Sequence, residues 1–278
     1  MSPKMKMKMG RSTARKPAQP FLHHLRGRFF RHNVPGGAIP AAPAEPAVRK
    51  SQATLTANEQ ARFLAAINTF NGNGFYGAFV AIHADMRHRM HSMDGPIGTQ
   101  RFLPWHRAYL VELERELRTL DPALFIPYWD WTVDRDVPAW LASFTPTVIA
   151  DGRRIVVTRT PGQSGALPTQ NGVNNALANA TYTPFTSALE QVHNTVHVWV
   201  GGTMSSIPTA PADPLFWMHH TNIDRLWNVW QQTHANQNPQ LTGQNAVLDP
   251  WTLREPDTRR IADLGYSYAA AQRAAGHR

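Results

Sequence analysis

The chain has 278 residues, of which 42% are hydrophobic and 17% charged, and it contains no cysteine. This composition is typical of a globular protein, and it excludes disulfides, thiolate metal sites and cysteine nucleophiles. The net charge of +9 comes from residues 1–50, which hold eleven Lys or Arg and one acid, so the remainder is near neutral and nucleic-acid binding is not expected. No apolar run approaches the roughly 20 residues that cross a bilayer, so no membrane contact is expected.

Residues 1–48 are predicted to form a basic, disordered N-terminal extension rich in Pro, Ala and Gly, and residues 49–278 to form a single domain. The first residues alternate in charge and lack the apolar stretch of a secretory signal. A cytoplasmic location is therefore expected, and export together with a partner stays open.

The first predicted helix begins at a capping box of Thr56 and Glu59 and ends in the segment 71–74. A second helix is predicted from about Phe75 to about His91, with Gly and Pro residues at 95–98 ending that segment. A third is predicted from about Trp105 to Leu120 because apolar residues recur there at helical spacing.

Residues 152–162 resemble a strand or a strand pair, and residues 264–269 a terminal strand. Between them, two further helices are predicted over about 184–200 and about 214–234. The predicted fold class is therefore mainly α: a four-helix bundle that can house a dinuclear metal site, with long loops and a few short strands.

Histidines are concentrated in two clusters, one over residues 83–106 and one over residues 193–220. His193 and His197 are four residues apart on a predicted helix, so both rings lie on one face. His220 on the next helix can complete a site of three histidines with an open position, and the first cluster has enough histidines for a second such site. Ligation by imidazole alone suits copper, zinc, iron or nickel rather than magnesium or calcium. The spacing does not say which metal.

Four segments resemble the copper-binding segments of the tyrosinase family, the type-3 copper group that includes tyrosinases, catechol oxidases and molluscan haemocyanins. They are FLPWHRAYLVELERELRTLDP (102–122), PYWDW (127–131), HNTVHVWVGGTM (193–204) and DPLFWMHHTNIDRLWNVW (213–230). The resemblance covers roughly residues 49–268. It implies two copper ions held by three histidines each, with dioxygen and a small phenolic molecule as reactants.

By this resemblance, His193, His197 and His220 hold the second copper, and His219 is a neighbour that hydrogen-bonds or packs. Phe216 is expected to stack on the ligand rings, and Asp224 to fix an imidazole tautomer or to pair with an arginine.

The first copper is assigned to His83, His91 and His106. The middle ligand is predicted to be His91 because it is nearer the end of the predicted helix, where the chain can turn toward the metal. His88 is the alternative.

The resemblance further implies that Glu190 and Asn194 hold a water that takes the proton of a phenol. The predicted function is a copper-dependent oxidation of phenols, o-diphenols or both to o-quinones. The alternatives are an o-aminophenol oxidase or a haemocyanin-like oxygen carrier. The resemblance also leaves room for a helper protein that delivers copper.

Overall fold

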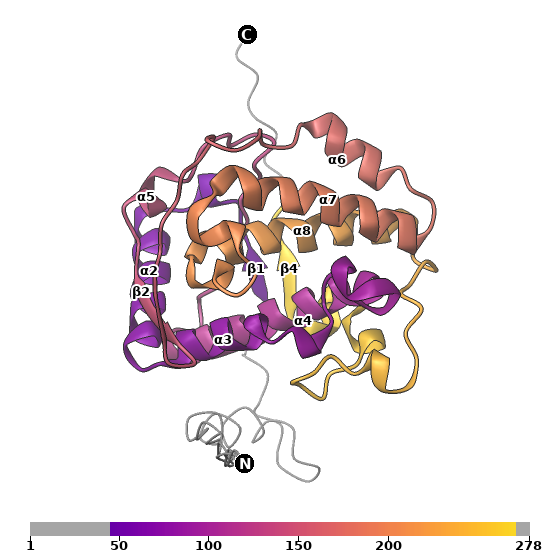
Figure 1. Ribbon diagram of the computed structural model, residues 1–278, viewed down its shortest axis with the longest axis horizontal. Helices are drawn as coiled ribbons and strands as arrows, with labels where there is room; N and C mark the ends of the chain where they lie inside the picture. The colour runs from indigo at the N-terminus through magenta and orange to yellow at the C-terminus, as the bar shows by residue number, and fades with distance from the viewer. Residues whose placement is uncertain (1–44, 271–278) are drawn as a thin grey trace, which may run out of the picture. The chain divides into compact units, whose positions relative to one another are not determined.

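The computed structural model describes residues 45–270 (Figure 1). Most of the predicted N-terminal extension, residues 1–44, lies outside the described residues. The predicted boundary at residue 48 falls inside strand β1 (Ala47–Arg49), which pairs in parallel with the last strand, β4 (Tyr266–Tyr268). The parallel pairing with β4 extends over all three residues of β1, so residues 47 and 48 belong to the folded part of the described chain.

The described part is mainly helical, as the sequence predicts. The long helices are α2 (Ala57–Gly72), α3 (Phe75–Ala84), α4 (Gly95–Leu120), α7 (Tyr182–Val200) and α8 (Pro214–Thr233). Shorter elements are α5 (Ala139–Ala142), α6 (Gln170–Leu177) and the antiparallel hairpin of β2 (Thr147–Ala150) and β3 (Arg153–Val156). The short α6 was not predicted. Within the described range, no helix is both long enough and apolar enough to span a membrane.

The predicted capping box at the start of α2 is present. The Thr56 hydroxyl accepts a hydrogen bond from the Glu59 backbone N–H at 3.2 Å, and the Glu59 carboxylate accepts one from the Thr56 N–H at 2.9 Å. These two bonds satisfy backbone donors that the first turn of a helix leaves open. The helix then buries Phe63, Ile67 and Phe70.

The predicted second helix is too long by about two turns, because α3 ends at Ala84. Asp85 leaves the helical conformation, and its carboxylate caps the Arg87 N–H at 3.1 Å, which starts a separate 3-10 turn, Met86–His88. Arg89 then adopts a left-handed conformation with φ of 48°, which reverses the chain. His91 therefore lies on an irregular segment and not on a helix.

The Gly and Pro residues at 95–98, predicted to end a helix, instead form the first turn of α4. Proline is tolerated there because the first N–H groups of a helix have no intrahelical partner. Pro104 lies inside the same helix and cannot donate to the Gln100 carbonyl, but the Tyr182 hydroxyl donates to that carbonyl at 3.2 Å. The helix therefore continues through Pro104 and begins ten residues earlier than predicted.

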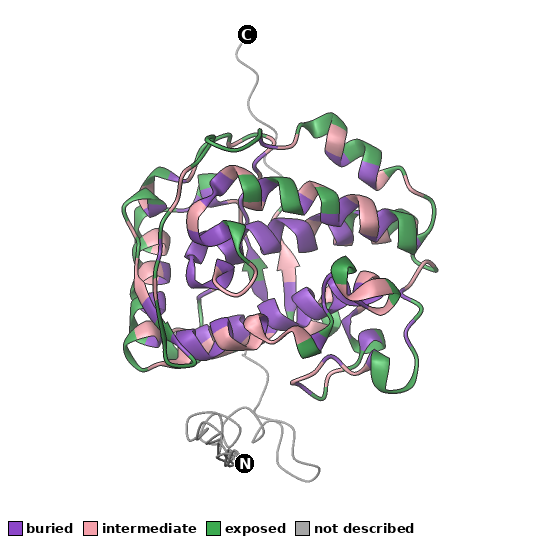
Figure 2. Ribbon diagram, in the orientation of Figure 1, coloured by how far each residue is buried: buried purple, intermediate pink, exposed green. Residues whose placement is uncertain are grey.

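Four helices position the histidine clusters, as the predicted bundle requires. Helices α7 and α8 run side by side and both contact α4, while α3 meets α4 where the Tyr109 hydroxyl donates to the Phe79 carbonyl at 2.7 Å (Figure 1). Helix α8 is buried along most of its length, whereas α6 exposes one side (Figure 2). Six tryptophans on these helices and the adjoining loops are fully buried: Trp105, Trp129, Trp131, Trp217, Trp227 and Trp230. Trp105 packs on His83 and His106, and Trp131 on His219, while the others fill the rest of the core.

Candidate metal centre

The first histidine group brings together His83 from α3, His91 from the irregular segment and His106 from α4. One ligand atom of each lies within 4.8 Å of the others, and all three side chains are buried. The ring centroids are separated by 5.2–5.5 Å. The structure thus places His91, and not His88, beside the other two.

His88 does not belong to this group. Its Nδ1 forms a short contact with the Asp249 carboxylate, which also accepts a hydrogen bond from Arg101 at 2.5 Å. Its ring stacks on Trp105 at 5.8 Å. Asp249 therefore holds the segment that precedes His91, a role that no local sequence pattern indicates.

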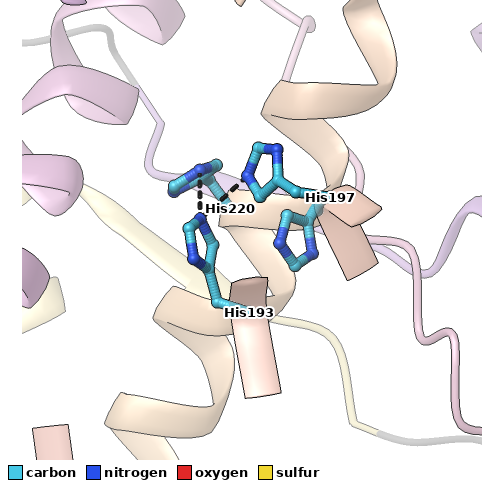
Figure 3. A group of neighbouring side chains, drawn as sticks. His193, His197 and His220 are labelled. Atoms are coloured by element: carbon cyan, nitrogen blue, oxygen red, sulfur yellow. Dashed lines mark hydrogen bonds between the residues drawn. The ribbon is translucent and has the colours of Figure 1, made fainter. Parts of the chain in front are cut away.

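The second group includes His193 and His197 on α7 and His220 on α8 (Figure 3). The Nε2 atom of His193 lies 2.9 Å from Nε2 of His197 and 3.0 Å from Nε2 of His220. The three labelled rings point toward one another, and the dashed contacts meet at His193 (Figure 3). The four-residue spacing on α7 brings its two rings to one face, as predicted.

Backbone carbonyls determine which ring nitrogen carries the proton in three of these histidines. A carbonyl oxygen only accepts, so Nδ1 of each of these rings must carry the proton and donate it. The three bonds are His83 to the Ile207 carbonyl at 3.0 Å, His106 to the Phe102 carbonyl at 2.7 Å and His197 to the Met204 carbonyl at 2.7 Å. Each Nε2 then presents a lone pair to its group. Ile207 and Met204 lie in one loop, so that loop orients a ring in each group; the sequence gives no direct signal for this.

Burial keeps the histidines neutral. It lowers the pKa of His83, His106, His193 and His220 well below the ordinary value, and neighbouring imidazoles lower it further. Burial lowers the pKa of His91 and of His197 to about 4. Neutral imidazole is the form that binds a metal, and several lone pairs pointing at one place favour a cation there.

The two groups lie next to each other. The rings of His106 and His220 stack with centroids 4.4 Å apart. Phe216 packs on His220 at 4.1 Å and on His83 at 5.0 Å, so it contacts both groups, which agrees with the stacking expected for it. Phe102 likewise packs at 5.0 Å on both His106 and His193. Sequence reasoning missed Phe102, although it lies one helical turn before His106.

His219 is the fourth histidine of the second group. Its Nδ1 accepts a hydrogen bond from the Trp131 indole N–H at 3.0 Å, and its ring stacks on His193 at 4.9 Å. It therefore both hydrogen-bonds and packs, as expected of a neighbour of the ligands.

Asp224 does not contact an imidazole in any described interaction. It forms ion pairs with Arg107 and Arg49, and it accepts hydrogen bonds from the Tyr266 and Tyr268 hydroxyls at 2.7 and 2.5 Å. Of the two alternatives expected for it, the pairing with arginine is the one present. These contacts tie α8 and α4 to the two terminal strands.

Glu190 and Asn194 lie on α7 on either side of His193. Glu190 is buried; one carboxylate oxygen accepts the Ser92 N–H at 2.9 Å, and the other has no partner among the described residues. Burial raises the pKa of Glu190, and the Asp94 carboxylate adds to this rise. The Asn194 side chain is exposed, and its Oδ1 lies 3.0 Å from Nδ1 of His193.

In both groups the donor atoms are nitrogen, and no carboxylate joins either cluster in the described part of the chain. Neutral imidazoles gathered in this way fit a transition metal, and they do not fit magnesium or calcium, which need oxygen ligands. Two such groups in contact suit a pair of metals that share one small molecule.

Comparison with known proteins agrees with this geometry. The family model described as the common central domain of tyrosinase matches residues 73–182 and 145–233. A tyrosinase of Streptomyces glaucescens is 34% identical over an alignment of 263 positions. The alignment covers 75% of this chain and 94% of that protein.

Two solved structures have a similar fold. A functional unit of octopus hemocyanin gives a TM-score of 0.63 at 23% identity, covering 81% of this chain and 68% of that one. A grape (Vitis vinifera) polyphenol oxidase gives a TM-score of 0.56 at 20% identity, covering 84% of this chain and 87% of that one.

Proposed function

This chain belongs to the tyrosinase family of type-3 copper oxidoreductases, and from that premise we propose that it oxidises phenols, o-diphenols or both to o-quinones. The family acts on phenolic substrates with dioxygen. The observation that carries the proposal is the pair of adjoining three-histidine groups, joined by the stacked rings of His106 and His220.

We assign one copper ion to His83, His91 and His106 and the other to His193, His197 and His220. The support is the set of donor atoms, which are six neutral imidazoles that are buried or half-buried. In three of them Nδ1 donates to a backbone carbonyl, which leaves the lone pair on Nε2. When bound, the copper ions supply the redox chemistry, accepting electrons from the phenol and transferring them to dioxygen.

The overall reactions balance without another reductant. Two o-diphenols give up four electrons and four protons, which convert one dioxygen to two waters and leave two o-quinones. One monophenol and one dioxygen give one o-quinone and one water. The chain must therefore bind the aromatic ring beside the histidines, exclude bulk water and accept the phenolic proton.

Substrate is proposed to approach beside His197. Of the six assigned ligands, His197 alone is half-buried rather than buried. The next residue, Val198, is 48% exposed, which makes it an apolar surface beside this ring. The position suits a flat aromatic molecule that must reach the second group from solvent.

Glu190 and Asn194 are proposed to hold a water that accepts the phenolic proton. The unpartnered oxygen of Glu190 is free to accept a hydrogen bond from such a water, and the raised pKa makes its carboxylate a stronger base. The contact of Asn194 with Nδ1 of His193 gives Asn194 a second role, orienting that ring.

The test is oxygen uptake by the full chain after copper is added to the purified protein, with tyrosine, catechol and o-aminophenol as separate substrates. Quinone formation from catechol, with or without tyrosine, supports the proposal. Uptake with o-aminophenol alone makes the chain an aminophenol oxidase, and oxygen binding without turnover makes it a carrier. Failure of added copper to load, followed by loading during co-expression with a copper-delivery protein, would establish the helper.

A further inference from the structure

The second group holds four histidines, although three complete an open site. A ligand atom of each of His193, His197, His219 and His220 lies within 4.8 Å of the others. His219 and His220 are adjacent on α8 and both are buried, so burial does not explain why one would bind metal and the other would not.

The hydrogen bond of His219 differs in direction from those of the carbonyl-bound histidines. An indole N–H only donates, so Nδ1 of His219, 3.0 Å from Trp131 Nε1, must be the unprotonated nitrogen. A neutral imidazole then carries its proton on Nε2. His197 is the opposite case, because its Nδ1–H donates to Met204 O and leaves the lone pair on Nε2.

We infer that Trp131 is a positioning residue that excludes His219 from metal binding and so leaves His220 as the third ligand. With its proton on Nε2, His219 has an N–H and no lone pair at that atom, and its one lone pair, on Nδ1, is occupied by the indole. His219 then fills the space beside His193 as a neutral ring, stacked at 4.9 Å, without competing for the metal.

The segment that carries Trp131 is fixed to the same helix as His219. The backbone N–H of Trp129 donates to the Met218 carbonyl of α8 at 3.1 Å, and the Asp130 carboxylate forms an ion pair with Arg225 of α8 at 2.8 Å. Trp131 itself is fully buried. The indole N–H is therefore held in place before any metal arrives, as a preorganised contact around a metal site must be.

This inference rests on the proposed metal binding of the second group, but its first test does not need metal. In the metal-free protein, ¹⁵N NMR should show a protonated Nε2 and an unprotonated Nδ1 for His219, and the reverse for His197. In Trp131→Phe the shifts of His219 should move toward a mixture of tautomers. A protonated Nδ1 on His219 in the unmodified chain would overturn the inference.

The second test measures copper affinity at the second group. We expect His220→Ala to weaken it by at least ~10-fold, and Trp131→Phe/His220→Ala to recover much of that loss because His219 is released as a ligand. Adding His219→Asn to that pair should abolish the recovery. The matched control is Trp129→Phe/His220→Ala, which removes another fully buried indole, one that donates to Asp134 O, and should give no recovery.

The outcomes separate the two proposals. If the unmodified chain binds no copper at the second group, the proposed function fails whatever the tautomer. If it binds copper but the folded Trp131→Phe/His220→Ala variant recovers nothing, or recovers equally without His219, the role of Trp131 is overturned and the proposed function stands.

Discussion

At the scale of single residues, the first group depends on which histidine reaches it from the irregular segment between α3 and α4. His91 lies 5.3 and 5.2 Å from the rings of His83 and His106, whereas His88 contacts Asp249. We expect His91→Ala to lower the copper content by about one ion per chain, because a three-histidine site has no spare ligand.

The matched variant His88→Ala should keep both ions. Elemental analysis of the two purified variants checks this. Loss of copper from His88→Ala with full retention in His91→Ala would reverse the assignment.

Glu190 offers a residue-scale test of proton handling. Glu190→Gln keeps an oxygen for the Ser92 N–H but removes the base. Hydroxylation of a monophenol should fall more than oxidation of a catechol, which is more acidic and needs no ring hydroxylation; a general base typically contributes about 10²–10⁴-fold.

Initial rates on both substrates, at equal copper content, measure the effect of Glu190→Gln. An equal loss on both would mean that Glu190 only supports the segment at Ser92.

At the scale of elements, α4 can begin where it does because Gly98 lets its first turn approach the backbone of His91. A Cβ at Gly98 would lie 1.9 Å from the His91 carbonyl oxygen, which cannot be relieved by a side-chain rotation. Gly98→Ala should therefore cost about 1–3 kcal/mol of unfolding free energy, and it should weaken copper binding at the first group.

Gly72→Ala is the control for Gly98→Ala. Gly72 is the last residue of α2 and would meet nothing within 4 Å, so alanine there should be neutral or stabilising by up to about 1 kcal/mol. Urea unfolding of both variants measures their free energies of unfolding and tests these two expectations. Equal stability of the two would contradict the close approach.

The helices that the sequence predicts well are those that carry their own boundaries, such as the capping box of Thr56 and the glycines after Val200. The start of α4 differs from the predicted one because the helix depends on a distant contact. Pro104 is tolerated because Tyr182, 82 residues beyond Gln100, supplies a donor to the freed carbonyl. A local pattern cannot reveal such a contact.

The same distinction holds for the site. The i, i+4 pair on α7 can be found from spacing, the choice of His91 over His88 follows from its place nearer the end of the predicted helix, and the resemblance distinguishes His220 from His219. The hydrogen-bond partners that orient the rings lie outside these patterns. They are loop carbonyls for His83 and His197, and Trp131 for His219. These partners are distant in sequence or are backbone atoms, so their identity requires the fold.

At the scale of the whole molecule, one buried charge cluster joins the two ends of the described domain to the bundle. Asp224 on α8 pairs with Arg49 of β1 and Arg107 of α4, and all three are buried. Asp224→Asn should cost about 3–5 kcal/mol of unfolding free energy, because it leaves the buried guanidinium of Arg107 without its carboxylate partner, while Arg49 keeps its pair with Glu114.

The exposed pair of Asp263 and Arg260, 3.5 Å apart, provides the control. Asp263→Asn should change stability little, since exposed pairs contribute at most about 1 kcal/mol. Chemical denaturation at neutral pH compares the two variants, and similar losses would contradict the importance of burial.

The same cluster sets a pH dependence. Burial raises the pKa of Asp224, but Arg107 and Arg49 outweigh it, and the net pKa in the folded state is lowered. Its contribution to stability is thus complete above the unfolded pKa of about 3.9, and it is lost as the pH falls through the folded value. The stability difference between the unmodified chain and Asp224→Asn should therefore shrink below about pH 4. A difference that stays constant down to acid unfolding would contradict this.

In the proposed function, two adjoining histidine groups act together on a phenol and dioxygen. The most direct measurement is the rate of oxygen uptake with catechol as copper is titrated into the metal-free full chain. We expect little uptake at low loading, a rise that ends at about two copper ions per chain, and o-quinone formed in step with the oxygen consumed. Full activity at about one ion per chain, or two bound ions with no uptake, would contradict it.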